Sequence, residues 1–331
     1  MLSGFKGEVF VSEIRSLIQE AIEGLSHEPK KGICMTQGEH GEQGEQGEQR
    51  EHGEQGQANF MSTHAPRKVA IAGLGAIGKR IAMALDQGLP GMSLAAVAVG
   101  NPDKASPFVS GLHHPPRIVP LADLAQHADI VIECAPASLM RDLAEPVLKA
   151  GKTLMVLSVG ALLLNEDLID LAKAHHGKIL VPTGALLGID ALIAAAEGEI
   201  HSVTMKSSKP PAGFHGAPFL VQRNIEVLGI KEAMQLYAGS AREAAIGFPA
   251  NLNVAIAASL AGIGVDRTRL EIWADPNITR NTHELIVESD AARLTMKIEN
   301  IPSENPKTGR ITAQSVIALL RKMGGHLALG T

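Results

Sequence analysis

The sequence predicts an α/β protein in which a doubly wound parallel sheet is followed by a second, α+β domain. Two observations support this prediction. Between Lys68 and Val181, short apolar, β-branched runs alternate with helical patterns, which is typical of a parallel sheet covered by helices. After about Leu187, strand-like runs and helices are segregated, which is typical of an α+β domain. The length of 331 residues is sufficient for two domains.

The elements of the first domain follow from their local patterns. Apolar runs predict the strands Lys68–Ala72, Leu94–Val99, Ile130–Cys134, Thr153–Leu157 and Lys178–Val181. Apolar residues at helical spacing between these runs predict the helices Ile77–Asp86, Leu121–Gln126, Arg141–Lys149 and Asn165–His175. This alternating order predicts that residues 66–188 form the first domain.

The elements of the second domain, residues 189–310, are predicted in the same way. The helical patterns are Asp190–Glu197 and a long stretch near Arg242–Ala261. The strand-like runs are His201–Lys206, Arg269–Trp273, Glu284–Glu288 and Arg293–Ile298. In the last segment, residues 311–331, helical spacing over Thr312–Met323 predicts a helix that returns to cap the first domain.

Residues 1–65 lie outside the predicted fold. The Gly-Glu-Gln repeat from Gly38 to Gly56 has no apolar residue, so it cannot offset its ordering entropy and is expected to be disordered. Acidic residues interrupt the first apolar stretch, which argues against a signal or transit peptide. Met61 offers an alternative start of translation, in which case the upstream segment is dispensable for catalysis.

Composition excludes several functional classes. Lys and Arg number 30 and Asp and Glu 35, so the formal charge of -5 favours neither nucleic acid nor a membrane surface as a partner. No apolar run reaches the ~18–20 residues of a membrane span. The two cysteines, Cys34 and Cys134, are too few for a disulfide framework or a thiolate metal site. We expect a cytoplasmic protein.

A glycine motif directly follows the first strand and opens the first helix. In Gly73-Leu-Gly75-Ala76-Ile77-Gly78, the first glycine permits a tight turn, the second gives a pyrophosphate access to the backbone, and the third allows close helix packing. The helix N-terminus then faces negative charge. The motif therefore predicts a Rossmann-type, dinucleotide-binding domain, with Ala76 and Ile77 also at the cofactor. A glycine-rich turn without a ligand is the alternative.

The end of the second strand bears on the choice between NAD and NADP. An acid there would bind the ribose hydroxyls of NAD and repel a 2′-phosphate. This chain has the neutral Asn101 instead, with Lys104 close by. We therefore predict that Asn101 contacts the cofactor and that NADP is accepted as well as NAD. Lys104 as a solvated loop charge is the alternative.

His283 is the candidate for proton transfer. It ends a dense polar segment, residues 275–283, which is predicted to be a loop between two apolar strands. Loops on a rigid scaffold commonly carry catalytic groups, although a structural role for this histidine remains open. No zinc-protease motif and no serine nucleophile elbow occur, so no metal site is predicted.

Six segments in series, between about Lys68 and Arg321, resemble the L-aspartate dehydrogenase family. They are Gly73–Gly78, Pro182–Asp190, Gly239–Ala245, Phe248–Ala255, Ala274–Pro276 with Asn281–His283, and Asn305–Thr308. The chain departs from the family pattern at Leu186-Leu187-Gly188, where the family usually has Ile-Gly, and in its long N-terminal extension.

The resemblance implies NAD(P)-dependent oxidative deamination of L-aspartate to iminosuccinate, which hydrolyses to oxaloacetate and ammonia, and a link to NAD biosynthesis. It also implies that His283 is the catalytic residue and that Ala185 and Asn253 contact the cofactor. On physical grounds, the loop of the second, catalytic domain that carries His283 would then close over the cofactor.

A dicarboxylate substrate requires cationic or amide partners, and Lys209, Arg280 and Lys307 are the candidates. Each is equally compatible with a solvated surface charge. By base rate we expect a homodimer. Two other functions stay open: another two-domain NAD(P)-dependent reductase, for example of the sugar-oxidoreductase type, and a non-catalytic sensor of nucleotide redox state.

Overall fold

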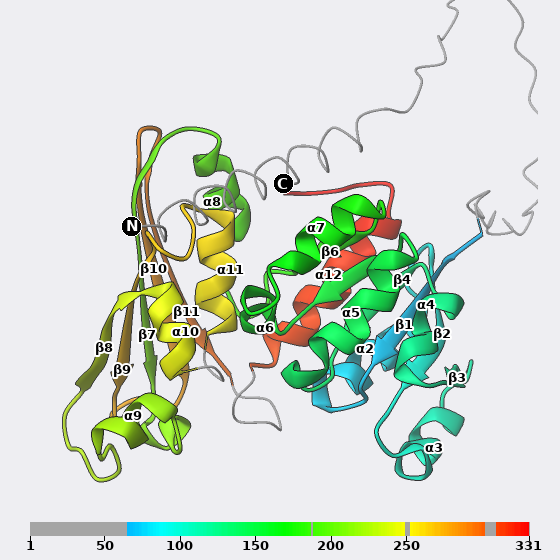
Figure 1. The fold of residues 1–331 in the computed structure, drawn as a ribbon, viewed down its shortest axis with the longest axis horizontal. Coiled ribbons are helices and arrows are strands. Elements are labelled where there is room, and N and C mark those ends of the chain that lie inside the picture. The colour runs from blue at the N-terminus through cyan, green and yellow to red at the C-terminus, as the bar shows by residue number, and fades with distance from the viewer. Residues whose placement is uncertain (1–64, 187, 249–251, 302–308, 331) are drawn as a thin grey trace, which may run out of the picture.

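The structure is a computed structural model that describes residues 65–186, 188–248, 252–301 and 309–330. The predictions for the N-terminal extension, other than residue 65, and for Lys307 lie outside these residues. Figure 1 shows two bodies side by side, each built on its own sheet.

The first body is a six-stranded parallel sheet in the order β3-β2-β1-β4-β5-β6, which is the order of a doubly wound dinucleotide-binding fold. The predicted fold class is confirmed. Its strands are β1 (Arg67–Ala72), β2 (Met92–Ala98), β3 (Arg117–Ile118), β4 (Ile130–Glu133), β5 (Thr153–Val156) and β6 (Lys178–Leu180). The central strands β4 and β5 are buried along their whole length, as expected of a sheet covered on both faces.

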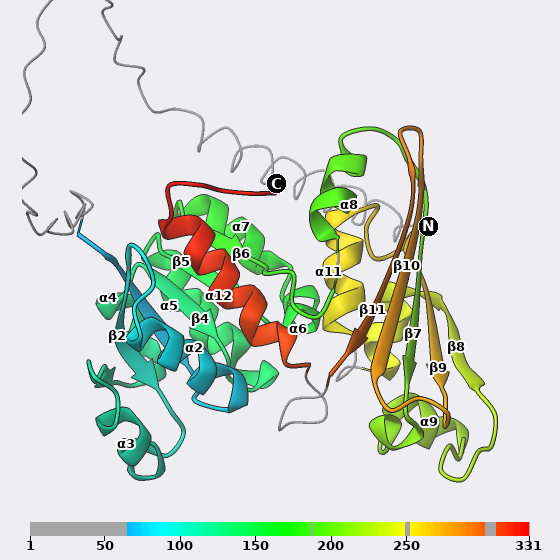
Figure 2. The ribbon, with the colours of Figure 1, turned by 180° about the vertical axis from the view of Figure 1, so that it is seen from behind.

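Helices cover both faces of this sheet. On one face, α2 (Ala76–Asp86) packs beside α12 (Ile311–Gly324), whose Val316 and Leu320 are fully buried in the same core cluster as β1 (Figure 2). On the other face, a second core cluster includes residues of α4 (Leu124–His127), α5 (Met140–Lys149) and α7 (Asp167–Ala174). The C-terminal helix therefore belongs to the core of the first body, although the second body precedes it in the sequence.

In the first body, two short helices were not expected from the sequence. One is α3 (Pro102–Ser110), which contains two prolines; Pro102 is tolerated in its first turn, and the Asn101 side chain caps it by accepting a hydrogen bond from the Lys104 amide at 2.9 Å. The other is α6 (Val159–Leu163), which follows β5 after two residues. Three 3₁₀ turns also occur in the described chain: η1 (Leu121–Asp123), η2 (Ala137–Leu139) and η3 (Pro211–Phe214).

The second body is a five-stranded mixed sheet in the order β11-β10-β7-β9-β8. Its strands are β7 (Ile200–Lys209), β8 (Met234–Ser240), β9 (Arg269–Ala274), β10 (Asn281–Ser289) and β11 (Arg293–Asn300). Strands β7 and β9 are parallel, and the other neighbours are antiparallel. Buried residues alternate along β7, β9 and β10, so one sheet face is packed and the other is more exposed.

The packed face carries the helices of the second body. These are α8 (Ile189–Ala196), α9 (Pro218–Arg223), α10 (Ala241–Gly247) and α11 (Asn253–Ala261). The single long helix expected near Arg242–Ala261 is thus two helices. The sequence has Pro249 shortly after α10, and a proline neither donates the helical hydrogen bond nor allows the preceding residue a helical conformation.

Candidate active site

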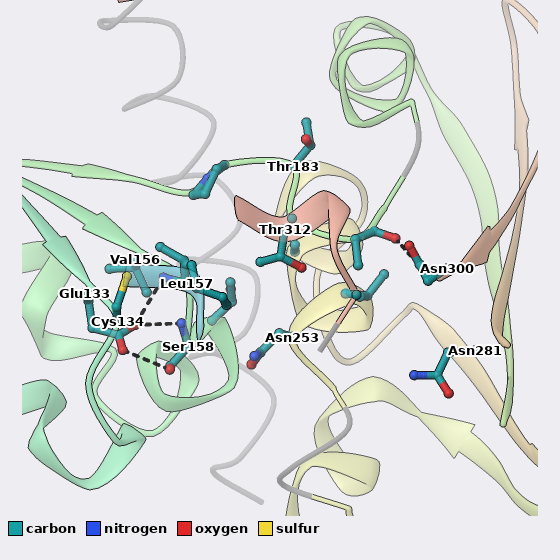
Figure 3. A pocket seen from close by; sticks show the side chains of 18 of the residues that line it. Glu133, Cys134, Val156, Leu157, Ser158, Thr183, Asn253, Asn281, Asn300 and Thr312 are labelled. Atoms are coloured by element: carbon teal, nitrogen blue, oxygen red, sulfur yellow. Dashed lines mark hydrogen bonds between the residues drawn. The ribbon is translucent and has the colours of Figure 1, made fainter. Parts of the chain in front are cut away.

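A cavity of about 340 Å³ lies between the two bodies. One wall comes from the carboxyl ends of β4, β5 and β6, and the other from α11 and the packed face of the second sheet. Figure 3 shows Glu133 and Ser158 on one side, Asn281 and Asn300 on the other, and Asn253 between them. Ligands of open α/β sheets bind at the carboxyl ends of the parallel strands, so this cavity is the candidate active site.

The glycine motif fits a dinucleotide at one end of this cavity. Gly73 has φ +97°, and a Cβ on it would collide with the backbone at Cys134. A Cβ at Gly78 would collide with the Gly73 carbonyl oxygen, whereas a Cβ at Gly75 would meet nothing within 4 Å. Gly75 is the N-cap of α2, so open space adjoins the unpaired amides of that helix start. These are the features that a bound pyrophosphate requires.

A buried carboxylate at the end of β4 organises the wall of the first body. Glu133 is 1% exposed and accepts hydrogen bonds from the Leu157 amide (3.1 Å) and from the Ser158 amide (2.7 Å) and hydroxyl (3.1 Å). Burial raises the pKa of Glu133, and these hydrogen bonds oppose the rise. Sequence reasoning missed this residue, because one acid in an apolar strand gives no signal of its own.

Backbone and amide groups join the two walls. The Gly160 amide donates to Asn253 Oδ1 at 3.1 Å, which links α6 of the first body to the start of α11. Asn300 Nδ2 donates to the Ala185 carbonyl oxygen at 3.2 Å, which links β11 to the segment after β6. Ala185 and Asn253, both predicted to contact the cofactor, therefore line the same cavity.

His283 is buried in the wall of the second body, at 4% exposure. It lies within β10 and not in the expected loop, because the strand already begins at Asn281. The polar side chains at 281 and 283 line the cavity. Its Nδ1 shares a 3.0 Å hydrogen bond with the Ser207 hydroxyl. Burial, and secondarily the charge of Lys209, lowers the pKa of His283 to about 3, so its ring is neutral near pH 7.

Lys209 lines the cavity beside His283 and is 5% exposed. Burial lowers the pKa of its ammonium group to about 8. Asn281 and Asn300, which pair with each other across β10 and β11, line the same wall. Neither asparagine was singled out from the sequence, since only the pairing of distant strands brings them to the cavity.

The other predicted site residues lie elsewhere. Asn101 is exposed, and its side-chain oxygen caps α3 near the end of β2. Arg280 is exposed just before β10 and is absent from the described lining of the cavity. Lys307 is outside the described residues.

The residues that the structure describes contain no group of three or more His, Cys, Asp or Glu side chains placed to hold a metal ion. None of their helices combines the length and the apolar character needed to cross a membrane.

Comparisons with known proteins match both bodies. The family model described as "Aspartate dehydrogenase, C-terminal" matches residues 190–323, and "Homoserine dehydrogenase, NAD binding domain" matches residues 73–182. The L-aspartate dehydrogenase of Bradyrhizobium diazoefficiens is 59% identical over 264 residues, covering 80% of this chain and 94% of that protein. L-aspartate dehydrogenase 3 of Bordetella bronchiseptica is 58% identical over 272 residues, covering 82% of this chain and all of that protein.

Among solved structures, the aspartate dehydrogenase of Thermotoga maritima superposes with a TM-score of 0.60 and 23% identity, covering 80% of this chain and 99% of that one. At this identity the match supports the fold, and the two close relatives carry the assignment. The chain belongs to the L-aspartate dehydrogenase family.

Proposed function

We propose that the chain is an L-aspartate dehydrogenase. It would oxidise L-aspartate to iminosuccinate with NAD or NADP, and iminosuccinate then hydrolyses to oxaloacetate and ammonia. The observation that carries the proposal is the placement of the buried side chains His283 and Lys209 in one cavity, together with strand ends and the first turn of the glycine-motif helix. Membership of the family supports it.

The cofactor supplies the acceptor for the hydride that leaves the substrate α-carbon. Gly73, Gly75 and Gly78, with Ala76 and Ile77, would hold the pyrophosphate, since the helix start and the open space at Gly75 suit that group. Ala185 and Asn253 line the cavity from opposite walls and would hold the nicotinamide half. Asn101, at the end of β2, would lie beside the adenosine ribose.

His283 would be the catalytic residue. If the Ser207 hydroxyl donates to Nδ1, the proton of the neutral ring resides on Nε2, the free nitrogen of the ring. A neutral imidazole can then hydrogen-bond to the substrate beside the reacting carbon without adding a charge to the cavity. Substrate carboxylates would meet Lys209, Asn281 and Asn300 on the same wall. Arg280 and Lys307 remain predictions for this role.

A spectrophotometric assay tests the proposal. Purified full-length protein is given L-aspartate with NAD⁺ or NADP⁺, and the absorbance of the reduced nicotinamide is followed. Growth of the signal with L-aspartate, but not with L-malate or a polyol such as myo-inositol, supports the dehydrogenase. Growth with the polyol supports another two-domain reductase, and a flat trace together with measured cofactor binding supports a nucleotide sensor.

Three finer predictions accompany this function. A homodimer is expected by base rate, and sedimentation of the full chain tests it. A cytoplasmic location is supported by the low cysteine count, and fractionation of cells tests it. A role in NAD biosynthesis requires iminosuccinate as the released product, which is tested by trapping that imine before it hydrolyses.

A further inference from the structure

Two titratable side chains of the second sheet come from neighbouring strands and face the same cavity. In the ladder between β7 and β10, His283 pairs with Ser207 and Thr282 pairs with Ser208. Lys209 is two residues beyond Ser207, so it lies on the same face of the sheet as Ser207 and His283. The electrostatic effect of Lys209 on the pKa of His283 shows that the two groups are close.

We propose that Lys209 accepts the proton that the α-ammonium group of the substrate loses during oxidation, and that His283 acts beside it as a neutral hydrogen-bonding group. This inference rests on the proposed function, because it names the proton acceptor of that reaction.

Two of the titratable groups in the cavity are unsuited to accept the proton. Among the described residues, the titratable side chains that line it are Glu133, Cys134, Lys209 and His283. Hydrogen bonds from the chain at 157 and 158 occupy the carboxylate of Glu133, and burial raises the pKa of the Cys134 thiol well above its usual range. Neither group is suited to accept a proton from an ammonium group near pH 8.

Hydrogen bonding and basicity together separate the remaining two groups. Where the Ser207 hydroxyl donates to Nδ1 of His283, the free Nε2 carries the ring proton and is a donor, not a proton acceptor. With a pKa near 3, His283 is a very weak base, and the transfer of a proton to it from an alkylammonium group is strongly uphill. With a pKa near 8, the amine of Lys209 is about one-tenth neutral at pH 7 and mostly neutral at pH 9. This basicity suits a proton acceptor that works near neutral pH, and its cause is the burial of the ammonium group.

The step balances as follows. The neutral Lys209 amine takes one proton from the substrate ammonium, the α-carbon releases a hydride to the oxidised nicotinamide, and the nitrogen lone pair forms the C=N bond. The products are protonated iminosuccinate, the reduced cofactor and the Lys209 ammonium. The new positive charge then lies where the substrate carboxylates are expected, which combines the predicted carboxylate contact with the proton transfer.

The pH profile of kcat/KM for L-aspartate tests this assignment. In the wild type, we expect kcat/KM to fall about tenfold per pH unit below about pH 8, because the neutral amine is the active form. In Lys209→Arg, the guanidinium keeps the positive charge but cannot lose its proton. We expect kcat to fall by about 10²–10⁴-fold, the usual range for removing a general base, and the limb near pH 8 to disappear. If Lys209 only binds a carboxylate, Lys209→Arg retains kcat and the limb, and the proposal is overturned.

Two variants sharpen the result. Lys206→Arg makes the same change on the same strand but on the opposite face, where Lys206 lies over the Trp273 ring at 4.6 Å, so we expect the wild-type profile. Lys209→Ala should regain activity when a small primary amine such as methylamine is added, in proportion to the concentration of its neutral form. Failure of every added amine, in a variant that still binds the cofactor, would contradict the role of a proton acceptor.

A measurement independent of turnover uses the full chain labelled with ¹³C at lysine Cε. We expect one resonance, missing in Lys209→Arg, to titrate near pH 8, and a titration near the ordinary value of about 10.4 would overturn the proposal. The proposed function fails separately: a wild type that reduces neither nicotinamide with L-aspartate refutes the dehydrogenase, whatever this resonance shows. An active wild type whose limb persists in Lys209→Arg refutes the assignment of Lys209 alone.

Discussion

The two walls of the cavity are built in different ways. The first body contributes consecutive residues at or after the ends of β4, β5 and β6, together with Ile77 of the glycine-motif helix α2. The second body contributes side chains from β7, β10 and β11, which lie far apart in the sequence. A glycine motif for a dinucleotide is compatible with many chemistries, whereas we expect the side chains of the second body to determine which substrate reacts. We therefore expect cofactor affinity to depend mainly on the first body and turnover mainly on the second.

The largest effect that would test this division is at His283. We expect His283→Ala to lower kcat by about 10²-fold or more while the dissociation constant of the cofactor stays nearly unchanged. Stopped-flow turnover and fluorescence titration of the reduced cofactor measure the two quantities. Unchanged turnover would remove His283 from the mechanism. A large loss of cofactor affinity would show that the second wall also determines cofactor binding.

Two glycines of the motif in the first body allow a matched comparison. Gly78→Ala places a methyl group against the Gly73 carbonyl, so we expect a loss of about 1–3 kcal/mol in the free energy of unfolding, as for other overpacked sites. Gly75→Ala meets open space, so stability should hold while cofactor affinity falls about tenfold, because the methyl occupies the approach of the pyrophosphate. Thermal unfolding and cofactor titration separate the two outcomes. If both variants lost the same stability and the same cofactor affinity, the two glycines would not have these separate roles.

The free energy of unfolding at acid pH tests the burial of His283 in the second wall without any substrate. The pKa of His283 is about 3 in the folded chain and about 6.5 when unfolded, so the unfolded state binds more protons between these values. This group should therefore lower stability as the pH falls from about 6.5 to 3, by at most about 1.4 kcal/mol per pH unit. Urea unfolding of wild type and His283→Asn across this range measures the difference, and parallel curves would show that the buried ring does not titrate this way.

The smallest expected effect is at the contact between the walls. Asn253→Ala removes the acceptor for the Gly160 amide, and we expect the KM for the cofactor to rise about 3–10-fold, equivalent to one hydrogen bond of about 0.5–1.5 kcal/mol. Asn253→Asp keeps an oxygen at this position and serves as the control. If both variants behave as the wild type, the link is dispensable for cofactor binding.

These two walls also differ in how far the sequence predicts them. The glycine motif and the parallel strands of the first body are local patterns, and the structure contains them close to their expected bounds. His283 could be singled out as a residue, but its place within a strand could not, because the polar side chains at 281 and 283 interrupt the apolar pattern there. Asn281, Asn300 and Glu133 were not singled out, since strand register and burial bring them to the cavity. The same register places Ser207 opposite His283.

The position of α12 has a consequence for dissecting the protein. Its Val316 and Leu320 complete the core beneath β1, and its Ser315 hydroxyl accepts a hydrogen bond from the Gly184 amide at 3.1 Å. A fragment ending at residue 188 would expose that apolar surface to water and would be prone to aggregate. Exchanging the nucleotide-binding half between relatives therefore requires grafting two separate stretches of chain, so a single recombination point cannot transfer it intact.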